Sequence, residues 1–442
     1  MDTMSQNAPT LVPPIRTEIK VAEETFLTDD FLRQLIDVGE VDILIGLPTH
    51  NNAKTIGAVV QSIQSGILRW FTRERVVIIN ADGGSRDGTP DLVTGISIDD
   101  LRPVSNLNAL RTLHSISTQY AGNPSSSAAL RTILAAAELL RAKACIVMSP
   151  ESSNIEGEWI SRLLAPIRND GFDLVTPTYR RHKFEGLLIT NLLYPMTRAL
   201  YGLRIREPYS HDSGFSGQFG SEFLSQNNWD DGAGGYGIEL RLTLAAITGQ
   251  RRICQSFLGT KEHIERRSAD LVPALRETVG PLFSALESTF SAWSAVSGSQ
   301  PVPTIGPDHE VLLDPLRVNR KRLRQMFSSG VAELESVFHS ILSPSTLAEL
   351  RRIARLDEAD FDYPTELWVR TVYEFAASYH KSVISRDHII QAFAPLFRGR
   401  VLTFLIENRS ASADEVENNI EGLCLEFERL KPYLLQMWKS RE

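Results

Sequence analysis

In the first half of this chain, continuous apolar runs alternate with segments whose apolar residues recur at helical intervals. No other feature of the sequence restricts the possible folds as strongly. The apolar runs have the composition of strands that are buried on both faces. They lie at residues 41–48, 75–84, 145–151 and 172–179. The segments between them, such as residues 51–67, repeat apolar side chains at helical intervals. Strands that alternate with helices in this way predict an α/β fold with a mainly parallel sheet.

The second half of the chain has a different pattern. After about residue 270, amphipathic helical segments follow one another without a strand-like run of comparable clarity. We therefore predict a flexible arm with a short helix at residues 1–35, an α/β domain at 36–270 and a helical C-terminal domain at 271–442.

One helical segment of this second half carries a pronounced apolar stripe, formed by Trp368, Val372, Phe375 and Tyr379. Side chains at this spacing share one face of a helix, and that face must be covered. Either the α/β domain or a second subunit can cover it, and we expect a homodimer.

The composition narrows the range of functions. The chain has 442 residues, and its formal net charge of −8 argues against general binding to nucleic acid. Cys145, Cys254 and Cys424 form no CxxC pair, which favours reduced thiols and a cytoplasmic location. We expect neither a signal peptide in the polar first residues nor a membrane span, since no run approaches the ~20 apolar residues that cross a bilayer.

Two loops at predicted strand ends are the most informative segments. They are "GLPTHNNAKTIGAVV" and "NADGGSRDGTPDL". Taken alone, the Asp82-Gly83-Gly84 turn fits an ordinary strand-to-helix junction. As a pair, the loops resemble the nucleotide-binding half of GT-A glycosyltransferases, where the aspartate holds the base and the first loop lines the nucleoside. The resemblance implies that the base and ribose are bound by Pro48, Thr49, Asn51 and Asp82.

The resemblance covers roughly residues 40–270 and is strongest to the soluble enzymes that make glucosylglycerate or glucosyl-3-phosphoglycerate. It implies a GT-A fold that transfers a hexose from a UDP- or GDP-sugar to a small hydroxy acid, such as glycerate or phosphoglycerate. It also implies retention of anomeric configuration, with the leaving phosphate rather than a protein base deprotonating the acceptor hydroxyl.

A metal site is the next implication of the resemblance. The family places Asp-x-Asp at a strand end and brings a later histidine to the same divalent ion, Mn²⁺ or Mg²⁺. The matching positions here are Ser149-Pro150-Glu151 and Gly259-Thr260-Lys261-Glu262-His263. Glu151 and His263 are therefore the expected metal ligands, with Ser149 acting through ribose or water. The alternative is a plain helix-capping turn without a metal.

Basic residues gather at 180–183, a composition that suits the carboxylate or phosphate of a small acid and equally fits a solvated loop. Arg181 and Lys183 are therefore candidate acceptor-binding residues, and Arg180 is a candidate catalytic residue. The resemblance adds Thr190, Asn191 and Asp212 as acceptor-binding residues. It also implies catalytic roles for Asp212 and Glu239.

Two other functions stay open. Nucleotidyl transfer on a similar sheet would need a basic glycine-rich loop after the first strand, and "LPTHNNAKTI" has none. A catalytically impaired sugar-nucleotide-binding or scaffold protein would explain the altered Ser-Pro-Glu and "SHDSG" segments. The sequence leaves the sugar, the acceptor and the base undetermined.

Overall fold

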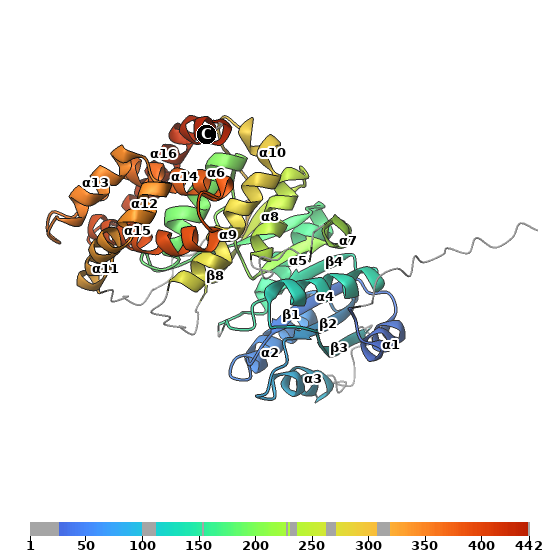
Figure 1. The fold of residues 1–442 in the computed structure, drawn as a ribbon. Helices are drawn as coiled ribbons and strands as arrows, with labels where there is room; N and C mark the ends of the chain where they lie inside the picture. The colour runs from blue at the N-terminus through green and yellow to red at the C-terminus, as the bar shows by residue number, and fades with distance from the viewer. Residues whose placement is uncertain are drawn as a thin grey trace, which may run out of the picture.

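The structure is a computed structural model that describes residues 26–99, 112–152, 154–226, 229, 237–261, 271–306 and 319–440. Figure 1 shows a sheet with its covering helices on one side of the molecule and helices α11 to α16 gathered on the other. The segment around α6, α8 and α9 lies between the two.

An eight-stranded sheet organises the first part, with strand order β10-β8-β5-β7-β4-β1-β2-β3. β7 runs antiparallel to β4 and β5, whereas the other described pairs are parallel. The strands are β1 Ile43–Thr49, β2 Arg75–Asp82, β3 Thr112–Gln119, β4 Ala144–Val147, β5 Leu174–Arg180, β7 Ser213–Ser216, β8 Ile253–Thr260 and β10 Thr304–Ile305. This topology confirms the predicted α/β class with a mainly parallel sheet, followed by a helical region.

Helices cover both faces of the sheet because the strands bury side chains on both. In β1, Ile43 and Ile45 pack among α2 and α5, and Leu44 packs on the opposite side with α4. The first layer comprises α2 Ile56–Trp70, α3 Thr89–Asp99 and α5 Glu158–Asp170. The second comprises α1 Asp29–Val38, α4 Ser126–Leu139, α7 Gly217–Gln226 and α8 Ile238–Thr248.

Several strands of the sheet, among them β3, β7 and the two-residue β10, were not expected from the sequence. β3 alternates polar and apolar residues and pairs with β2 alone among the described strands, so it lacks a continuous apolar run. β7 is only four residues long and contains Gly214. A Cβ on Gly214 would lie 2.6 Å from the Leu163 carbonyl oxygen, so the close crossing of α5 requires glycine there.

The remaining elements are mostly helical. They are η1 Ile189–Leu193, α6 Tyr194–Tyr201, α9 Val272–Ser288, α10 Phe290–Ser294, α11 Arg320–Glu333, α12 Glu335–Ile341, α13 Pro344–Ala354, α14 Thr365–Lys381, α15 Arg386–Glu407 and α16 Ala413–Lys439. A small two-stranded sheet joins β6 Leu203–Arg204 to β9 Gln300–Pro301. One apolar cluster runs from η1 and α6 through α8 and α9 to α16. The helical core therefore extends across the proposed domain boundary at residue 270.

The apolar stripe of α14 is covered within the same chain. Trp368, Val372 and Phe375 are fully buried, and Tyr379 is 7% exposed. They pack against side chains of α9, α13 and α15 in one cluster. The stripe therefore no longer calls for a second subunit, and the homodimer stays a prediction.

Helix α15 corrects one expectation from the sequence. Among the described residues it is the one helix that is long and apolar enough to cross a membrane. However, 83% of its most apolar stretch is buried inside the protein. Core helices of globular proteins commonly have this composition. The three cysteines are also buried, and burial raises the pKa of each thiol to about 12. A cytoplasmic location stays a prediction.

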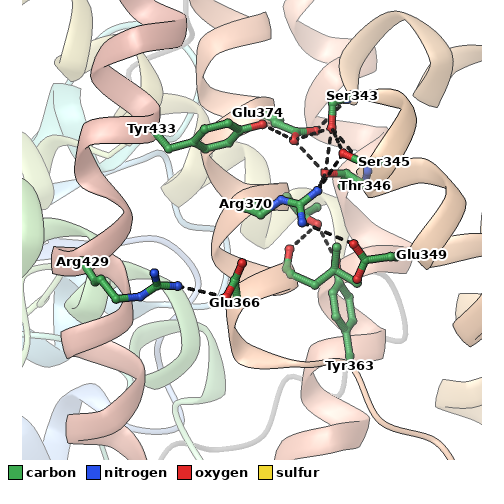
Figure 2. Close-up of polar contacts among 12 residues, drawn as sticks. Ser343, Ser345, Thr346, Glu349, Tyr363, Glu366, Arg370, Glu374, Arg429 and Tyr433 are labelled. Atoms are coloured by element: carbon green, nitrogen blue, oxygen red, sulfur yellow. Dashed lines mark hydrogen bonds and ion pairs between the residues drawn. The ribbon is translucent and has the colours of Figure 1, made fainter.

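A buried carboxylate ties three of the helices together, as Figure 2 shows. Glu374 of α14 accepts hydrogen bonds from the Ser343 backbone N–H at 2.8 Å and from the Thr346 hydroxyl at 2.7 Å, both at the start of α13. The Tyr433 hydroxyl of α16 donates to the same carboxylate at 2.6 Å. Glu374 is only 3% exposed, so these donors replace the hydrogen bonds that its carboxylate would make to water.

Candidate functional site

A cleft of about 510 Å³ opens at the carboxyl ends of the central strands. Its walls come from the chain after β1, after β3 and after β4, from the segment before β7, and from Gly237 and Glu277. Parallel α/β sheets bind ligands at this edge. Of the expected site residues, Pro48, Thr49, Ser149 and Glu151 line it.

The loops after β1 and β2 interlock beside the cleft. The Asn51 backbone N–H donates to Ser85 Oγ at 2.8 Å, and Asn51 Oδ1 accepts from the Arg86 N–H at 3.0 Å. The Ala53 N–H donates to Asp87 Oδ2 at 3.0 Å. Hydrogen bonds from the Thr89 hydroxyl and the Ala53 N–H lower the pKa of Asp87. Asn51, with a φ of 56°, thus braces the two loops and does not itself line the cleft.

Asp82 lies beneath the cleft and faces its own loop. Its carboxylate accepts from the backbone N–H groups of Gly84 at 2.9 Å and Ser85 at 2.7 Å, and from the Ser85 hydroxyl at 2.6 Å. Thr49 Oγ1 lies 2.9 Å from the same carboxylate. Asp82 is 3% exposed and does not line the cleft, which differs from the expected direct contact with a base. The structure gives it the role of holding the loop in shape.

Tyr120 lines the cleft beside the loop that follows β2. A Cβ at Gly83 would lie 2.7 Å from the Tyr120 hydroxyl, so the first glycine of the turn is needed for the ring to lie there. The Ser125 N–H donates to the same hydroxyl at 3.1 Å. The sequence prediction missed Tyr120 because it follows β3, the strand that the apolar pattern did not reveal.

The N-terminus of α4 points its first turn at the cleft. Ser125 caps the helix by accepting from the Ala128 N–H at 3.2 Å, and both Ser125 and Ser126 line the cleft. A helix start with hydroxyl side chains offers backbone donors and the positive end of the helix dipole. This end of the cleft is therefore suited to an anion such as a phosphate group.

Asp212 is the centre of a buried polar cluster behind the cleft. Its carboxylate lies 2.5 Å from Lys261 Nζ and accepts from the Tyr179 hydroxyl at 2.6 Å and from the Ser149 N–H at 2.8 Å. Burial alone would raise the pKa of Asp212, but the Lys261 ammonium and these donors lower it overall. Asp212 is fully buried and does not line the cleft, so its expected contact with an acceptor stays a prediction. Asp212 joins the ends of β4, β5 and β8.

His211, next in the chain, does line the cleft. Its Nδ1 lies 3.0 Å from Glu239 Oε1 at the start of α8, and its side chain is 43% exposed whereas that of Glu239 is 12% exposed. Burial would lower the pKa of His211, but the Glu239 carboxylate raises it overall. Burial would raise the pKa of Glu239, but His211 lowers it overall. The sequence placed Glu239 in the site and missed its partner, because the two are 28 positions apart.

The expected acceptor-binding residues lie away from the cleft. Arg181 pairs with Glu207 at 3.2 Å, and Lys183 Nζ donates to the carbonyl oxygens of Arg409 at 3.1 Å and Ala411 at 2.9 Å. Asn191 is fully buried, and its side-chain oxygen accepts from Arg400 Nε at 3.1 Å. Each of these side chains therefore has a protein partner, and the contacts of Lys183 and Asn191 reach the C-terminal helical region.

The last two expected residues of this group, Arg180 and Thr190, are half-buried at the end of β5 and in η1. Neither lines the cleft. No lysine or arginine lines it among the residues described.

The structure describes only one of the two expected metal ligands. Glu151 lines the cleft, and its backbone N–H lies 3.4 Å from Ser149 Oγ, whereas His263 lies outside the described residues. Within the described ranges, no group of three His, Cys, Asp or Glu side chains could hold a metal ion. Glu151 is thus the one expected ligand that the structure describes, and a complete site would need His263 and an oxygen of the bound ligand.

Comparisons with known proteins complete the description. No family model matches the chain, and no curated protein matches it. Among solved structures, it is similar to glucosyl-3-phosphoglycerate synthase of Mycobacterium tuberculosis in complex with Mn²⁺, UDP and glucosyl-3-phosphoglycerate, at 22% identity and a TM-score of 0.42. That match covers 55% of this chain and 79% of the synthase.

Two further structures of the same synthase are similar to this chain. The complex with Mn²⁺, UDP-glucose and phosphoglyceric acid has 22% identity and a TM-score of 0.41, covering 58% of this chain and 83% of that one. The complex with Mg²⁺ and UDP has 20% identity and a TM-score of 0.42, covering 59% and 83%. These synthases are the enzymes that the sequence motifs resemble.

Proposed function

We propose that this protein is a glycosyltransferase that moves a hexose from a nucleoside diphosphate sugar to a small hydroxy acid. The observation that carries the proposal is the cleft at the carboxyl ends of a mainly parallel sheet, with an aromatic wall at one side and the N-terminus of α4 facing it. An aromatic and proline-lined wall suits a base, and a helix N-terminus suits a diphosphate.

The cleft divides into parts that match such a donor. The base and ribose would lie against Pro48, Thr49 and Tyr120, with Asn51 and Asp82 fixing the loops behind them. The diphosphate would lie at Ser125 and Ser126. The Ser149 hydroxyl, two residues after β4, would meet the ribose or a bound water.

A divalent metal ion fits this arrangement because the cleft has no lysine or arginine among its described lining residues. Glu151 and His263 would hold the ion, which would neutralise charge on the leaving diphosphate. Two protein ligands make a weak site, so we expect Mn²⁺ or Mg²⁺ to bind appreciably only with the nucleotide sugar.

The acceptor would occupy the end of the cleft formed by Tyr209 and His211. Glycerate or phosphoglycerate is the acceptor class that the sequence motifs imply. Retention of configuration is part of this proposal, and a UDP- or GDP-hexose is the proposed class of donor.

The test is a transfer assay with UDP- and GDP-hexoses and glycerate or 3-phosphoglycerate, paired with calorimetric titration of the nucleotides. We expect a nucleotide to bind and the sugar to be transferred. Nucleotide binding without transfer would identify a binding or scaffold protein, and absence of both would overturn the proposal.

The metal has its own test. EDTA should abolish transfer and added Mn²⁺ should restore it. Glu151→Ala should remove the metal-dependent activity, whereas Glu158→Ala, on the exposed side of α5 with an i,i+4 partner in Arg162, should not. Full activity in EDTA would show that the site works without a metal.

A further inference from the structure

The His211–Glu239 pair is a feature that the retaining mechanism implied by the motifs does not use, because that mechanism assigns no protein base. The pair lies where the segment before β7 meets the start of α8. We propose that His211 is the general base that deprotonates the acceptor hydroxyl, with Glu239 as its positioning residue. This inference rests on the proposed glycosyl transfer.

The geometry of the pair fixes the form of the imidazole. Nδ1 lies 3.0 Å from Glu239 Oε1, so in the neutral ring Nδ1 carries the proton and donates it to the carboxylate. Nε2 then holds the lone pair, on the edge of the ring opposite Glu239. His211 lines the cleft and its side chain is 43% exposed, so a substrate can reach the ring. A histidine oriented by a buried carboxylate is a recurring form of general base.

The rigidity of both partners supports this role. Glu239 is held in the first turn of α8, and it also lines a small pocket of about 20 Å³ with Ser126 and His211. The Tyr209 ring packs edge-on against the imidazole, with centroids 5.3 Å apart. The imidazole is therefore held between an aromatic ring and a carboxylate.

In this step the acceptor hydroxyl attacks from the face that the diphosphate leaves, as retention of configuration requires, and His211 takes the proton in place of the leaving phosphate. Nε2 takes the proton of the acceptor hydroxyl while the acceptor oxygen forms a bond to the anomeric carbon of the hexose. The bond between that carbon and the diphosphate oxygen breaks, and its electron pair leaves with the nucleoside diphosphate. The imidazolium, stabilised by Glu239, then returns its proton to solvent.

The charged surroundings of the ring determine the expected pH dependence. Glu239 raises the pKa of His211, Asp212 adds to this effect and Lys261 opposes it. Asp212 and Lys261 are paired with each other, and Glu151 and Glu277 line the same cleft. A base works only when unprotonated. Transfer should therefore increase with pH through a pKa above the ordinary histidine value of 6.5.

The experiment measures kcat against pH for wild type, His211→Gln and Glu239→Gln, with nucleotide affinity measured in parallel. His211→Gln should lower kcat about 10²–10⁴-fold with nearly unchanged nucleotide affinity. Glu239→Gln should shift the acid limb of the profile to lower pH, because the neutral amide no longer raises the pKa of His211. His388→Gln, an exposed residue at the start of α15, is the matched control and should behave as wild type.

A third variant distinguishes a role of His211 as the base from a purely structural role. Added imidazole should restore part of the activity of His211→Ala, since it supplies the missing base in the space left by the side chain. A structural role for His211 predicts no such rescue.

Opposite results would overturn the inference. If His211 instead binds an anionic group as an imidazolium, activity or substrate affinity should fall as pH rises through its pKa. Full kcat in His211→Gln would also exclude the base role. Failure of the underlying function looks different, because wild type would then transfer no sugar at any pH.

Discussion

Single residues at the strand ends show how charge is arranged around the cleft. Asp82 and Asp212 are both buried carboxylates, and both accept hydrogen bonds from neighbouring groups of the protein. Each therefore shapes the cleft indirectly, through the loop or strand ends that it holds. Substitutions at these two residues should reveal that indirect role.

Replacing Asp82 should loosen the β2–α3 loop. Asp82→Ala leaves the Gly84 and Ser85 N–H groups without their acceptor, at a cost of about 1–3 kcal/mol for a buried donor. We expect weaker nucleotide binding in calorimetry together with a lower free energy of unfolding. Asp91→Ala, an exposed residue in the first turn of α3, should change neither. Wild-type affinity in Asp82→Ala would contradict the loop's part in binding.

Replacing Lys261 should leave the Asp212 charge buried and unpaired. Lys261→Met is expected to lower the free energy of unfolding by about 3–5 kcal/mol, and the double variant with Asp212→Asn should recover much of this loss. Denaturant unfolding of the two single variants and the double variant measures the coupling. Equal losses that simply add would show that the pair is not coupled.

The same pair gives a pH dependence with a definite sign. The pKa of Asp212 is lowered in the folded protein, below its ordinary value of 3.8, so the stabilisation is present above that value. It should be lost as pH falls through the folded pKa. Acid unfolding should therefore be less steep in the double variant than in wild type below about pH 3.8.

At the scale of secondary structure, helix ends carry much of the polar organisation. The start of α4 faces the cleft, and the start of α13 is held by Glu374 of the neighbouring α14. Ser343 also caps α13 through its side chain, which accepts from the Thr346 N–H. Figure 2 shows that donors from α13 and α16 meet on this one carboxylate.

Removing that carboxylate should separate the helix ends. Glu374→Ala leaves the Ser343 N–H and the hydroxyl groups of Ser343, Thr346 and Tyr433 without this acceptor, and we expect a loss on the order of 3 kcal/mol. Glu366→Ala, in the same helix, removes only an exposed pair with Arg429 and should cost about 0–1 kcal/mol. Thermal unfolding of the two variants should differ clearly. A similar small change in both would show that the Glu374 contacts contribute little.

At the scale of the whole molecule, side-chain contacts join the C-terminal helices to the segment that follows β5, including η1 and α6. Lys183 reaches the carbonyl groups after α15, and buried Arg198 of α6 pairs with Glu421 and Glu428 of α16. Trp368 donates to the Asn191 carbonyl at 3.0 Å. These contacts join residues that are 177 to 230 positions apart in the sequence.

Deleting the chain after residue 275 should therefore expose the apolar surface of η1 and α6. We expect insoluble protein or strong binding of a hydrophobic dye. A soluble, folded fragment that still binds nucleotide would show that the α/β part stands alone. Light scattering of the intact chain tests the predicted homodimer separately.

The sequence by itself determined the strand and helix alternation and the edge of the sheet where the cleft opens. It could do so because apolar periodicity is local, and because carboxyl ends of parallel strands converge whatever surrounds them. Pro48, Thr49, Ser149 and Glu151 reach the cleft for this reason. The polar β3 and the short β7 carry too little apolar pattern to be recognised in this way.

Only the tertiary structure decided which polar groups pair. His211 meets Glu239, Asp212 meets Lys261 and Arg181 meets Glu207 across 26 to 49 positions of chain. Such pairs depend on how elements pack, because a buried charge is stable only with a partner, and without one burial favours the neutral form of the group. The sequence therefore marked the carboxylates and basic residues as important, but the packing assigned His211 to the cleft and Asp212 and Arg181 to the framework behind it.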